Sequence, residues 1–520
     1  MTTASVVTTT ARALLRSRLL TPPNPAGALC LVREMCRGGT NPVTLLAIAA
    51  ARAPHRAAVI DDDGVITYRE LQSKTEALAH ELYRRGVQPG QTVGVLCRNG
   101  RGLLEAVFAV ALVGADVVLV NTEFRTDALA AALSAHRITT VVCDNEFAQQ
   151  VAATAESMTA IDPATIETRG RERPKVAAAG RIILLTSGTT GKPKGVPRAP
   201  RILSAFGVGV TILDRTGLRL GSRISVAVPM FHGLGLGMAM LTVGLAGTIL
   251  TRRRFDAEAA LAQASLHRAQ AFTAVPVMLA RIVDLPHTVR VRNPVPYLRV
   301  VISSGDRLDP SVARRFMDTY GDILYNGYGS TEAGVGALAT PADLREAPET
   351  VGRPVAGCSV RILDENGNPV GPHVTGRVFV GGTLTARGYT GGGAKTVVDN
   401  MINTGDMGYF DESGRLYVVG RDDDMIVSGG ENVYPRAVEN ALAEHPDIAD
   451  NAVIGVPDEQ FGRRLAAYVV PRPDTEIDEA AVREYLKDKV SRFEQPRDVS
   501  IVSNIPRNPA GKVMRNELPT

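Results

Sequence analysis

The segment with the clearest chemical character is residues 186–195, which read Thr-Ser-Gly-Thr-Thr-Gly-Lys-Pro-Lys-Gly. Hydroxyl groups, glycine amides and lysine ammonium groups occur together in it, and all three bind phosphate oxygens. A mostly apolar run at residues 181–185 predicts a buried strand, so the segment should leave a sheet where ligands of open α/β folds usually lie. We therefore expect a phosphate-binding loop with the candidate ligands Thr186, Ser187, Gly188, Thr189, Thr190, Gly191, Lys192 and Lys194.

Two other kinds of loop have a similar composition. The P-loop of nucleotidases has four residues between its glycines and a Ser or Thr after its lysine. Here only two threonines separate Gly188 from Gly191, and Pro193 after Lys192 prevents the direct continuation into a helix that a P-loop makes. An ordinary surface turn is the remaining alternative, and such turns rarely carry this many hydroxyl groups directly after an apolar strand.

Four further motifs follow the loop along the chain. They are Asn-Gly-Tyr-Gly-Ser-Thr-Glu at 326–332, Asn-Thr-Gly-Asp at 403–406, Gly-Arg-Asp-Asp-Asp at 420–424 and Asn-Pro-Ala-Gly-Lys at 508–512. Together with the loop they resemble the acyl-adenylate-forming superfamily, which includes acyl-CoA synthetases, firefly luciferase and the adenylation domains of peptide synthetases. The resemblance covers roughly residues 45–515, and a bacterial fatty acyl-CoA synthetase is the member that the chain resembles most. Five motifs in the family's order are not expected by chance.

The resemblance implies where ATP and magnesium bind. The loop would hold the β- and γ-phosphates, Thr331 would donate to the α-phosphate, and Glu332 would organise the metal ion. The other implied nucleotide ligands are Gly305, Asn326, Tyr328 and Gly329 around adenine, Asp406 at the ribose, and Arg421 at the ribose or a phosphate. A glutamate after Ser-Thr is more often an acid at the start of a helix, but its place within the motif favours the metal role.

The resemblance also implies a mobile C-terminal lid. Lys512 would bridge the substrate carboxylate and the α-phosphate during adenylation, and Asp423 would be the hinge about which the lid turns. The same rotation would bring Ser428, Gly429 and Gly430 to the site, where glycines let the thin pantetheine arm of coenzyme A pass.

The acyl-binding residues are less clear from the sequence. His232 lies in a segment that resembles the family's acyl pocket and is expected beside the substrate carboxylate; a histidine in a plain turn is the alternative. The apolar and glycine-rich residues 233–241 favour an aliphatic tunnel with Gly235 in its wall, and no aspartate is present there to pair with an α-amino group. Asp306 stands where the family has a small residue beside adenine, so the packing of that wall should differ.

These motifs predict a fatty acid–CoA ligase that forms AMP and pyrophosphate, with ATP, magnesium and coenzyme A as its cofactors and co-substrates. A fatty acyl-AMP ligase that loads a carrier protein, an aryl-CoA ligase and a non-catalytic nucleotide- or acyl-binding regulator are the alternatives. The presence of both Glu332 and Lys512 argues against the regulator. Catalysis should consist of positioning and electrostatic stabilisation, because the reaction needs no protein nucleophile.

Composition indicates a soluble cytoplasmic enzyme. The chain has 45% hydrophobic and 22% charged residues, and its net charge of +4 is dispersed, which gives no case for nucleic-acid binding. Its five cysteines have no paired spacing, as expected in a reducing compartment. The sequence leaves homo-oligomerisation open.

Two segments could suggest a membrane. Residues 1–33 carry arginines and no acid, but they form no clean apolar stripe, so we expect a mobile or loosely docked extension, with weak contact to anionic lipid as the alternative. Residues 233–250 are uncharged and long enough to span a bilayer, but five glycines interrupt them. We therefore expect no integral membrane segment.

The elements that must position these motifs follow an α/β pattern. Short apolar strands alternate with helices up to about residue 350, as in parallel sheets, and a β-rich subdomain follows. A small α+β unit then begins after Gly420 and carries Lys512 at its far end. The expected organisation is an extension at 1–44, a large ATP- and acyl-binding domain at 45–420 and a mobile lid at 421–520.

Overall fold

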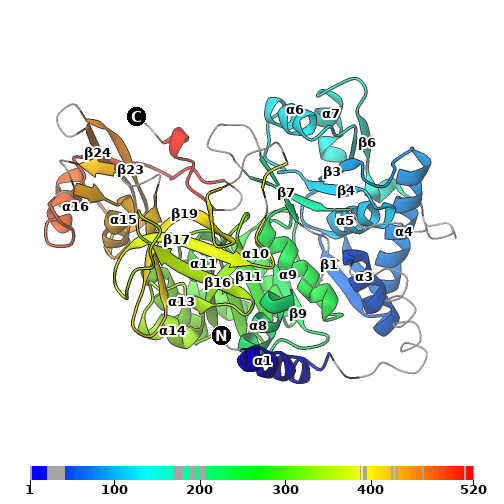
Figure 1. Cartoon of the computed structure of the whole chain (residues 1–520), viewed down its shortest axis with the longest axis horizontal. Helices are drawn as coiled ribbons and strands as arrows, with labels where there is room; N and C mark the ends of the chain where they lie inside the picture. The colour runs from blue at the N-terminus through cyan, green and yellow to red at the C-terminus, as the bar shows by residue number, and fades with distance from the viewer. Residues whose placement is uncertain are drawn as a thin grey trace.

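The computed structural model describes most of the 520 residues, and Figure 1 colours them in chain order. The described ranges are 3–19, 21, 41–167, 180–186, 194–198, 206–386, 388–390, 395–422, 426–428, 431–458, 462–492, 494–508 and 511–518. A large part, blue to yellow, forms most of the molecule, and a smaller part, orange to red, lies at one end of it (Figure 1).

A six-stranded sheet lies at the end of the large part that is remote from the smaller part (Figure 1). Its strand order is β6-β5-β3-β4-β7-β8, and all neighbours are parallel except β7 and β8. The strands are β3 (Thr92–Leu96), β4 (Asp116–Leu119), β5 (Thr140–Cys143), β6 (Thr159–Ile161), β7 (Ile182–Thr186) and β8 (Lys194–Arg198). The antiparallel β7–β8 pair therefore forms a hairpin at one edge of a parallel sheet.

A nine-stranded sheet forms the centre of the large part, in the order β15-β14-β13-β12-β11-β9-β10-β1-β2. Its strands are β1 (Ala57–Asp61), β2 (Gly64–Thr67), β9 (Arg223–Val226), β10 (Thr248–Leu250), β11 (Ala271–Ala274), β12 (Val300–Ser303), β13 (Leu324–Ser330), β14 (Gly334–Ala339) and β15 (Arg353–Pro354). The strands from β13 to β1 are parallel, so the carboxyl ends of β9, β11, β12 and β13 lie at the same end of the sheet.

Helices cover both sheets and fill the space between them. In the large part they are α1 (Thr3–Arg16), α3 (Pro42–Arg52), α4 (Tyr68–Arg84), α5 (Arg101–Val113), α6 (Thr126–Ala135), α7 (Ala148–Ala152), α8 (Phe206–Thr216), α9 (Gly233–Gly244), α10 (Ala257–Leu266), α11 (Pro276–Val283), α12 (His287–Arg292), α13 (Pro310–Tyr320) and α14 (Pro341–Glu346). Helix α5 buries residues 103–113 because it contacts α3 and α4 as well as β3 and β4. A helix enclosed in this way is apolar on every face.

An antiparallel sheet and the smaller part follow. The sheet contains β16 (Cys358–Leu363), β17 (Gly376–Gly382), β18 (Val397–Val398), β19 (Met401–Phe410) and β20 (Leu416–Arg421). The smaller part contains β21 (Ile426–Ser428), β22 (Glu431–Val433), α15 (Pro435–Ala443), β23 (Ile448–Asp458), β24 (Gly462–Pro471), α16 (Glu479–Leu486) and β25 (Asp498–Ile501). It has its own apolar core, which includes Ile426, Val438, Leu442, Val453, Leu465, Val482 and Val499. We call it the C-terminal unit.

The predicted fold class is confirmed, and several elements lie where the sequence pattern places them. The sequence pattern predicts a strand at 271–274 and a helix at 310–320, and β11 and α13 have those bounds. Residues 155–180 are polar and unpatterned and predict a connector, but Thr159–Ile161 within them form β6, which pairs with β5. Within the described ranges, no helix is long and apolar enough to cross a membrane.

The N-terminal segment forms a docked helix where a mobile or loosely docked extension was expected. Helix α1 packs against α8, Ala13 is fully buried, and Arg12 forms a two-pronged ion pair with Asp214 at 2.5 and 2.6 Å. The backbone of Leu220 also donates to the carbonyl of Ser17 at 2.8 Å. The sequence did not predict this docking because the described side chains that are buried here, Ala13 and Ser17, are small. The arginines of α1 and Leu15 are exposed, so no apolar stripe is visible in the sequence.

Replacing Ala13 by Asp should undock α1. The buried position offers no partner for a charge, so the variant should lose about 1–3 kcal/mol of unfolding free energy, limited by detachment of the helix alone. Thermal unfolding measures this, and Ala11→Asp on the exposed face of the same helix is the matched control. Equal transition temperatures for the two variants would mean that α1 adds nothing to stability.

Candidate functional site

The carboxyl ends of four neighbouring parallel strands supply most of the described candidate residues. His232 follows β9 within a few residues, Val275 directly follows β11, Gly305 follows β12, and Thr331 and Glu332 follow β13. Because these strands run in one direction, their following loops gather at one end of the sheet. The sequence-predicted adenine, metal and carboxylate residues are therefore brought to one region.

The β7–β8 hairpin carries the predicted phosphate loop. Thr186 ends β7 and Lys194 begins β8, directly opposite each other in the ladder. The chain thus returns as an antiparallel strand, which is not the strand-to-helix turn of a P-loop. The calls on Ser187, Gly188, Thr189, Thr190, Gly191 and Lys192 lie outside the described residues.

Tyr328 connects the adenine motif to the ribose motif. Its hydroxyl donates to Asp406 Oδ2 at 2.6 Å, and Thr404 Oγ1 lies 3.1 Å away. Arg421 Nη1 lies 3.5 Å from Asp406 Oδ1, and the two residues face each other across β19 and β20. Burial and then the nearby Asp406 carboxylate raise the pKa of Tyr328 well above its ordinary value, so the phenol keeps its proton.

Asn326 and Gly329 are held by neighbouring backbone. Asn326 is buried and its Nδ2 donates to the Thr350 carbonyl at 3.3 Å, so its amide is oriented before any nucleotide arrives. A side chain at Gly329 would place its Cβ only 2.1 Å from the carbonyl oxygen of Gly334. Only glycine therefore lets β13 and β14 approach here.

Glu332 is coupled to a residue that the sequence did not suggest. The Tyr389 hydroxyl donates to Glu332 Oε1 at 2.8 Å, and the ammonium of Lys194 lies 5.4 Å from the centre of the Tyr389 ring. Thr390 also donates from its backbone to the Gly195 carbonyl at 2.9 Å. Tyr389 thus joins the β7–β8 hairpin to the candidate metal-binding residue Glu332.

Glu332 is suited to bind a divalent cation. Burial alone would raise its pKa, but the Lys395 ammonium and the Tyr389 hydroxyl more than offset this and hold the pKa below its ordinary value. In the described residues, no three His, Cys, Asp or Glu side chains form a cluster for a metal ion. A single carboxylate beside a phosphate site fits magnesium, which typically takes one or two carboxylates, phosphate oxygens and water.

His232 is an uncharged residue at the start of α9. Burial lowers its pKa to about 4, and its ring lies 4.5 Å from that of Phe231. Its Nε2 is buried without a hydrogen-bond partner among the described residues. A neutral imidazole can approach a carboxylate as a hydrogen-bond donor without forming an ion pair.

Part of the expected tunnel wall in the segment after His232 faces the protein interior. A Cβ at Gly235 would lie 2.4 Å from the Pro229 carbonyl oxygen, so Gly235 packs on backbone, and the prediction that it lines a tunnel is wrong. Leu236 and Met238 belong to the buried core. The exposed face of α9 instead carries Gly233 and Gly237, and nothing lies within 4 Å of a Cβ at Gly237.

The Lys512 loop docks against the large part. Gly511 has φ of +83°, and a Cβ there would lie 3.0 Å from Val277 Cγ1 and 3.2 Å from Val275 Cγ2. A Cβ at Gly305 would also contact Val275, at 3.4 Å. Lys512 itself is exposed, so its loop reaches Val275, beside the candidate adenine residue Gly305, while the lysine side chain stays accessible.

Three hinge and coenzyme A candidates cannot be placed. Asp423, Gly429 and Gly430 lie outside the described residues. Ser428 ends β21, where it faces Glu431 of β22 and Gly462 of β24.

The described cysteines are unsuited to nucleophilic catalysis. Burial raises the pKa of Cys97 well above its ordinary value, that of Cys143 to about 12 and that of Cys358 to about 11. Since the thiolate is the nucleophile, these thiols are inert at neutral pH.

Comparison with known proteins places the chain in a family. Residues 46–390 match the AMP-binding enzyme family, and residues 437–512 match the AMP-binding enzyme C-terminal domain. The chain belongs to the AMP-binding enzyme family, which is the adenylate-forming superfamily that its motifs resemble. Adenylate-forming CoA ligases use ATP, magnesium and coenzyme A, which is the set expected from the sequence.

Three relatives illustrate the range of the similarity. Feruloyl-CoA synthase from Amycolatopsis sp is 32% identical over 479 residues, which cover 90% of this chain and 96% of the relative. The structure of o-succinylbenzoate CoA synthetase from Bacillus subtilis, in complex with its acyl-adenylate intermediate, matches with a TM-score of 0.82 and 27% identity over 91% and 97% of the two chains. An amide bond synthetase from Marinactinospora thermotolerans matches with a TM-score of 0.81 and 27% identity over 92% and 99%.

Replacing Tyr389 by Phe should shift the pH dependence of magnesium-dependent ATP binding. The change removes the hydroxyl that lowers the pKa of Glu332 and keeps the ring beside Lys194. The pKa of Glu332 should rise, so binding should be lost at a higher pH as the solution is acidified. Calorimetric titration over a pH series measures this shift.

Tyr417→Phe is the control, because it removes another tyrosine hydroxyl that donates to a carboxylate, that of Asp411 at 3.2 Å. Superimposable pH profiles for Tyr389→Phe and the parent would exclude the coupling of Tyr389 to Glu332.

Proposed function

We propose that the protein activates an aromatic carboxylic acid as its acyl adenylate and transfers the acyl group to coenzyme A. The observation that supports this most directly is the gathering of Glu332, Gly305 and the Lys512 loop at one end of the central sheet in an AMP-binding enzyme. The substrate carboxylate would attack the α-phosphorus and release pyrophosphate. The thiol of coenzyme A would then attack the acyl carbon and release AMP.

The substrate class is revised from the sequence-based expectation. Motifs alone favoured a fatty acid, with an aromatic acid as an alternative. The relative at 32% identity is a feruloyl-CoA synthase, and a solved neighbour is an o-succinylbenzoate CoA synthetase; both names contain an aromatic acid. The wrong wall assignment of Gly235 also removes part of the case for an aliphatic tunnel.

Each step of adenylation has a residue of the chain to perform it. Asp406, already held by Tyr328 and Arg421, would accept hydrogen bonds from the ribose hydroxyls. The β7–β8 hairpin and Thr331 would donate to phosphate oxygens. Magnesium would supply charge neutralisation for the phosphates, and the ionised Glu332 would hold it in place.

Lys512 and His232 would act at the acid itself. The Lys512 ammonium would neutralise charge that develops between the carboxylate and the α-phosphate, as a preorganised cation does in a partly desolvated site. The neutral His232 would border the acyl side, where it adds no charge that would trap the acid in its ground state.

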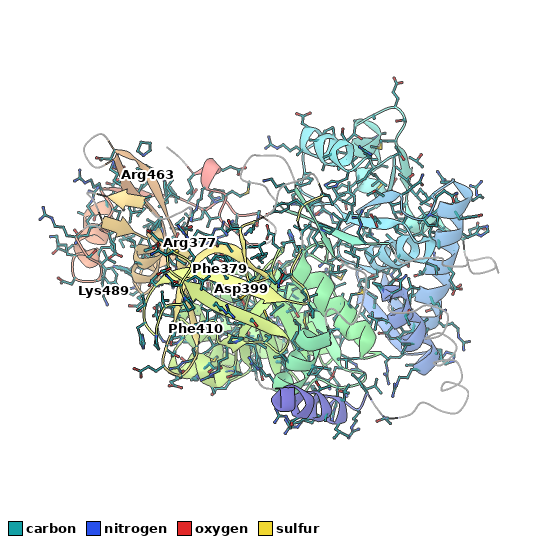
Figure 2. All side chains as sticks on the ribbon, in the orientation of Figure 1. Arg377, Phe379, Asp399, Phe410, Arg463 and Lys489 are labelled. Carbon is teal, nitrogen blue, oxygen red and sulfur yellow. The ribbon has the colours of Figure 1, made fainter. Side chains whose placement is uncertain are left out.

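A hinge after Asp422 would let one site serve two reactions. The Arg377 guanidinium, labelled in Figure 2, donates to Asp422 at 3.1 Å, and the Asp422 backbone donates to Gly405 at 2.8 Å. Asp422 is thus tied to the large part, whereas Ile426 already belongs to the core of the C-terminal unit. We place the pivot at Asp423, so the large domain extends two residues past the boundary at 420 that the sequence predicts, and the lid follows the pivot.

Replacing Lys512 by Ala should separate the two half-reactions. Adenylation, measured by ATP–pyrophosphate exchange, should fall roughly 10²–10³-fold, because one charged donor to the transition state is lost. Thioester formation from supplied acyl adenylate should be retained.

Lys489→Ala is the matched control, since Figure 2 shows Lys489 at the outer end of the same unit. An equal loss in both half-reactions would contradict the role of Lys512.

Replacing Gly237 by Phe should narrow the acyl site. The side chain would project from the open face of α9, and the helix should tolerate it because glycine is a poorer helix former. We expect kcat/KM for bulky aromatic acids to fall roughly 10- to 100-fold relative to small acids.

The measurement is CoA thioester formation over a panel of benzoic, cinnamic and saturated fatty acids. Leu266→Phe, at an exposed position of α10, is the control. Faster turnover of fatty acids than of every aromatic acid by the parent enzyme would refute the proposed substrate class.

A further inference from the structure

The junction between the large part and the C-terminal unit contains two ion pairs of opposite polarity. Arg507 Nη1 of the C-terminal unit lies 3.6 Å from Asp306 Oδ2, and Arg307 Nη1 lies 3.7 Å from Glu439 Oε2 on α15. Asp306 and Arg307 are consecutive, so one short loop after β12 carries both a negative and a positive charge. The negative charge faces Arg507 and the positive charge faces Glu439. All four side chains are between 17% and 29% exposed, which limits screening by solvent.

Arg507 also builds the loop that carries Lys512. Its Nη1 donates to the Gly511 carbonyl at 2.9 Å, and its other nitrogens donate to both oxygens of Asp450 at 2.7 and 3.3 Å. The Asn508 side chain closes the loop by accepting from the Lys512 backbone at 2.9 Å. The Arg507 guanidinium that faces Asp306 is therefore held in place. It is also hydrogen-bonded to the carbonyl of Gly511, the residue that precedes Lys512.

Burial and neighbouring charges shift the pKa values of Asp306 and Arg436 at the junction. Burial raises the pKa of Asp306, while Arg307, through its backbone N–H, and three cations of the C-terminal unit, Arg507, Lys512 and Arg436, act against that rise. Burial and then Arg307 lower the pKa of Arg436 to about 10, and the Glu439 carboxylate acts against that decrease.

A cavity interrupts the packing at this junction. A cavity of about 250 Å³ lies between the two parts, and it is lined by Arg307, Tyr409, Tyr417, Tyr434, Arg436 and Asn440. Its wall also contains apolar residues, among them Leu308, Pro310 and Val418, and a hollow of this size can hold several water molecules. The two ion pairs are specific contacts across the junction, because each requires its two charges to face each other.

We propose that Asp306 and Arg307, with Arg507 and Glu439, form a charge clamp that holds the C-terminal unit in the orientation that presents Lys512. The proposal rests on the adenylating role of Lys512 proposed above. The four are positioning residues: they act on the reaction only through the placement of the Lys512 loop. Asp306, which departs from the small residue of the family pattern, thereby acquires a function.

The test compares Asp306→Asn, which keeps the shape, with Asp306→Glu, which keeps the charge. We expect Asp306→Asn to slow ATP–pyrophosphate exchange three- to tenfold and to leave thioester formation from supplied acyl adenylate unchanged or faster. Asp306→Glu should retain most of the exchange rate. Added salt should slow exchange by the parent more than by Asp306→Asn, because only the parent has the full clamp to screen.

Glu444→Gln is the matched control, because its partner Lys489 lies 3.7 Å away within the C-terminal unit and is shown at the outer end of that unit in Figure 2. An equal loss in both half-reactions for Asp306→Asn, or no change in their ratio, would overturn the clamp.

Hydrogen–deuterium exchange without substrate separates this proposal from the proposed function. Asp306→Asn should speed the exchange of peptides that cover residues 505–514, and Glu444→Gln should not. If the parent adenylates no acid, the proposed function fails while the exchange result still decides the clamp. Unchanged exchange at residues 505–514 would exclude the clamp even in an active enzyme.

Discussion

Parallel strand pairing is the constraint on which the rest of the site depends. Because β9, β11, β12 and β13 run in one direction, the four loops that follow them emerge at one end of the sheet. These loops are far apart in the chain and carry different chemical groups. They supply the neutral imidazole of His232, the apolar side chain of Val275, the backbone of Gly305 and the carboxylate of Glu332. The antiparallel β7–β8 hairpin of the other sheet is then joined to them through Tyr389, which contacts Glu332 and lies beside Lys194.

Charge is arranged at the site before any ligand binds. The Asp406 carboxylate already accepts from Tyr328 and faces Arg421, and Glu332 already accepts from Tyr389. These partners should weaken ligand binding little. They hold each carboxylate in one orientation and leave its remaining lone pairs available as acceptors. Preorganised donors and acceptors of this kind need not reorient during a reaction that moves negative charge between phosphate and carboxylate.

The sequence predicted the fold class and the order of the motifs because both depend on local patterns. Apolar strands and glycine-rich turns are recognised from a few consecutive residues. The same holds for Pro193, which predicts that the chain does not continue directly into a helix. In agreement with this, Lys194 begins the second strand of the β7–β8 hairpin. What escaped depends on contacts between distant segments. The local sequence does not distinguish Tyr389 from other tyrosines, because its contact with Glu332 forms only in the folded chain. The local sequence also does not show that Gly235 packs against the Pro229 carbonyl. The proposed substrate class depends on the shape of the open face of α9, which composition describes poorly.

The ion pairs at the junction also constrain how the sequence can change. Asp306 and Arg507 are distant in the chain yet only 3.6 Å apart, and Arg507 shares its guanidinium with the loop of Lys512. A substitution at Asp306 alone would leave Arg507 facing a smaller or neutral group, so acceptable changes at the two positions are coupled. The C-terminal unit is therefore not a free-standing cassette: recombination with a relative that has a different loop after β12 would join halves whose charges do not correspond.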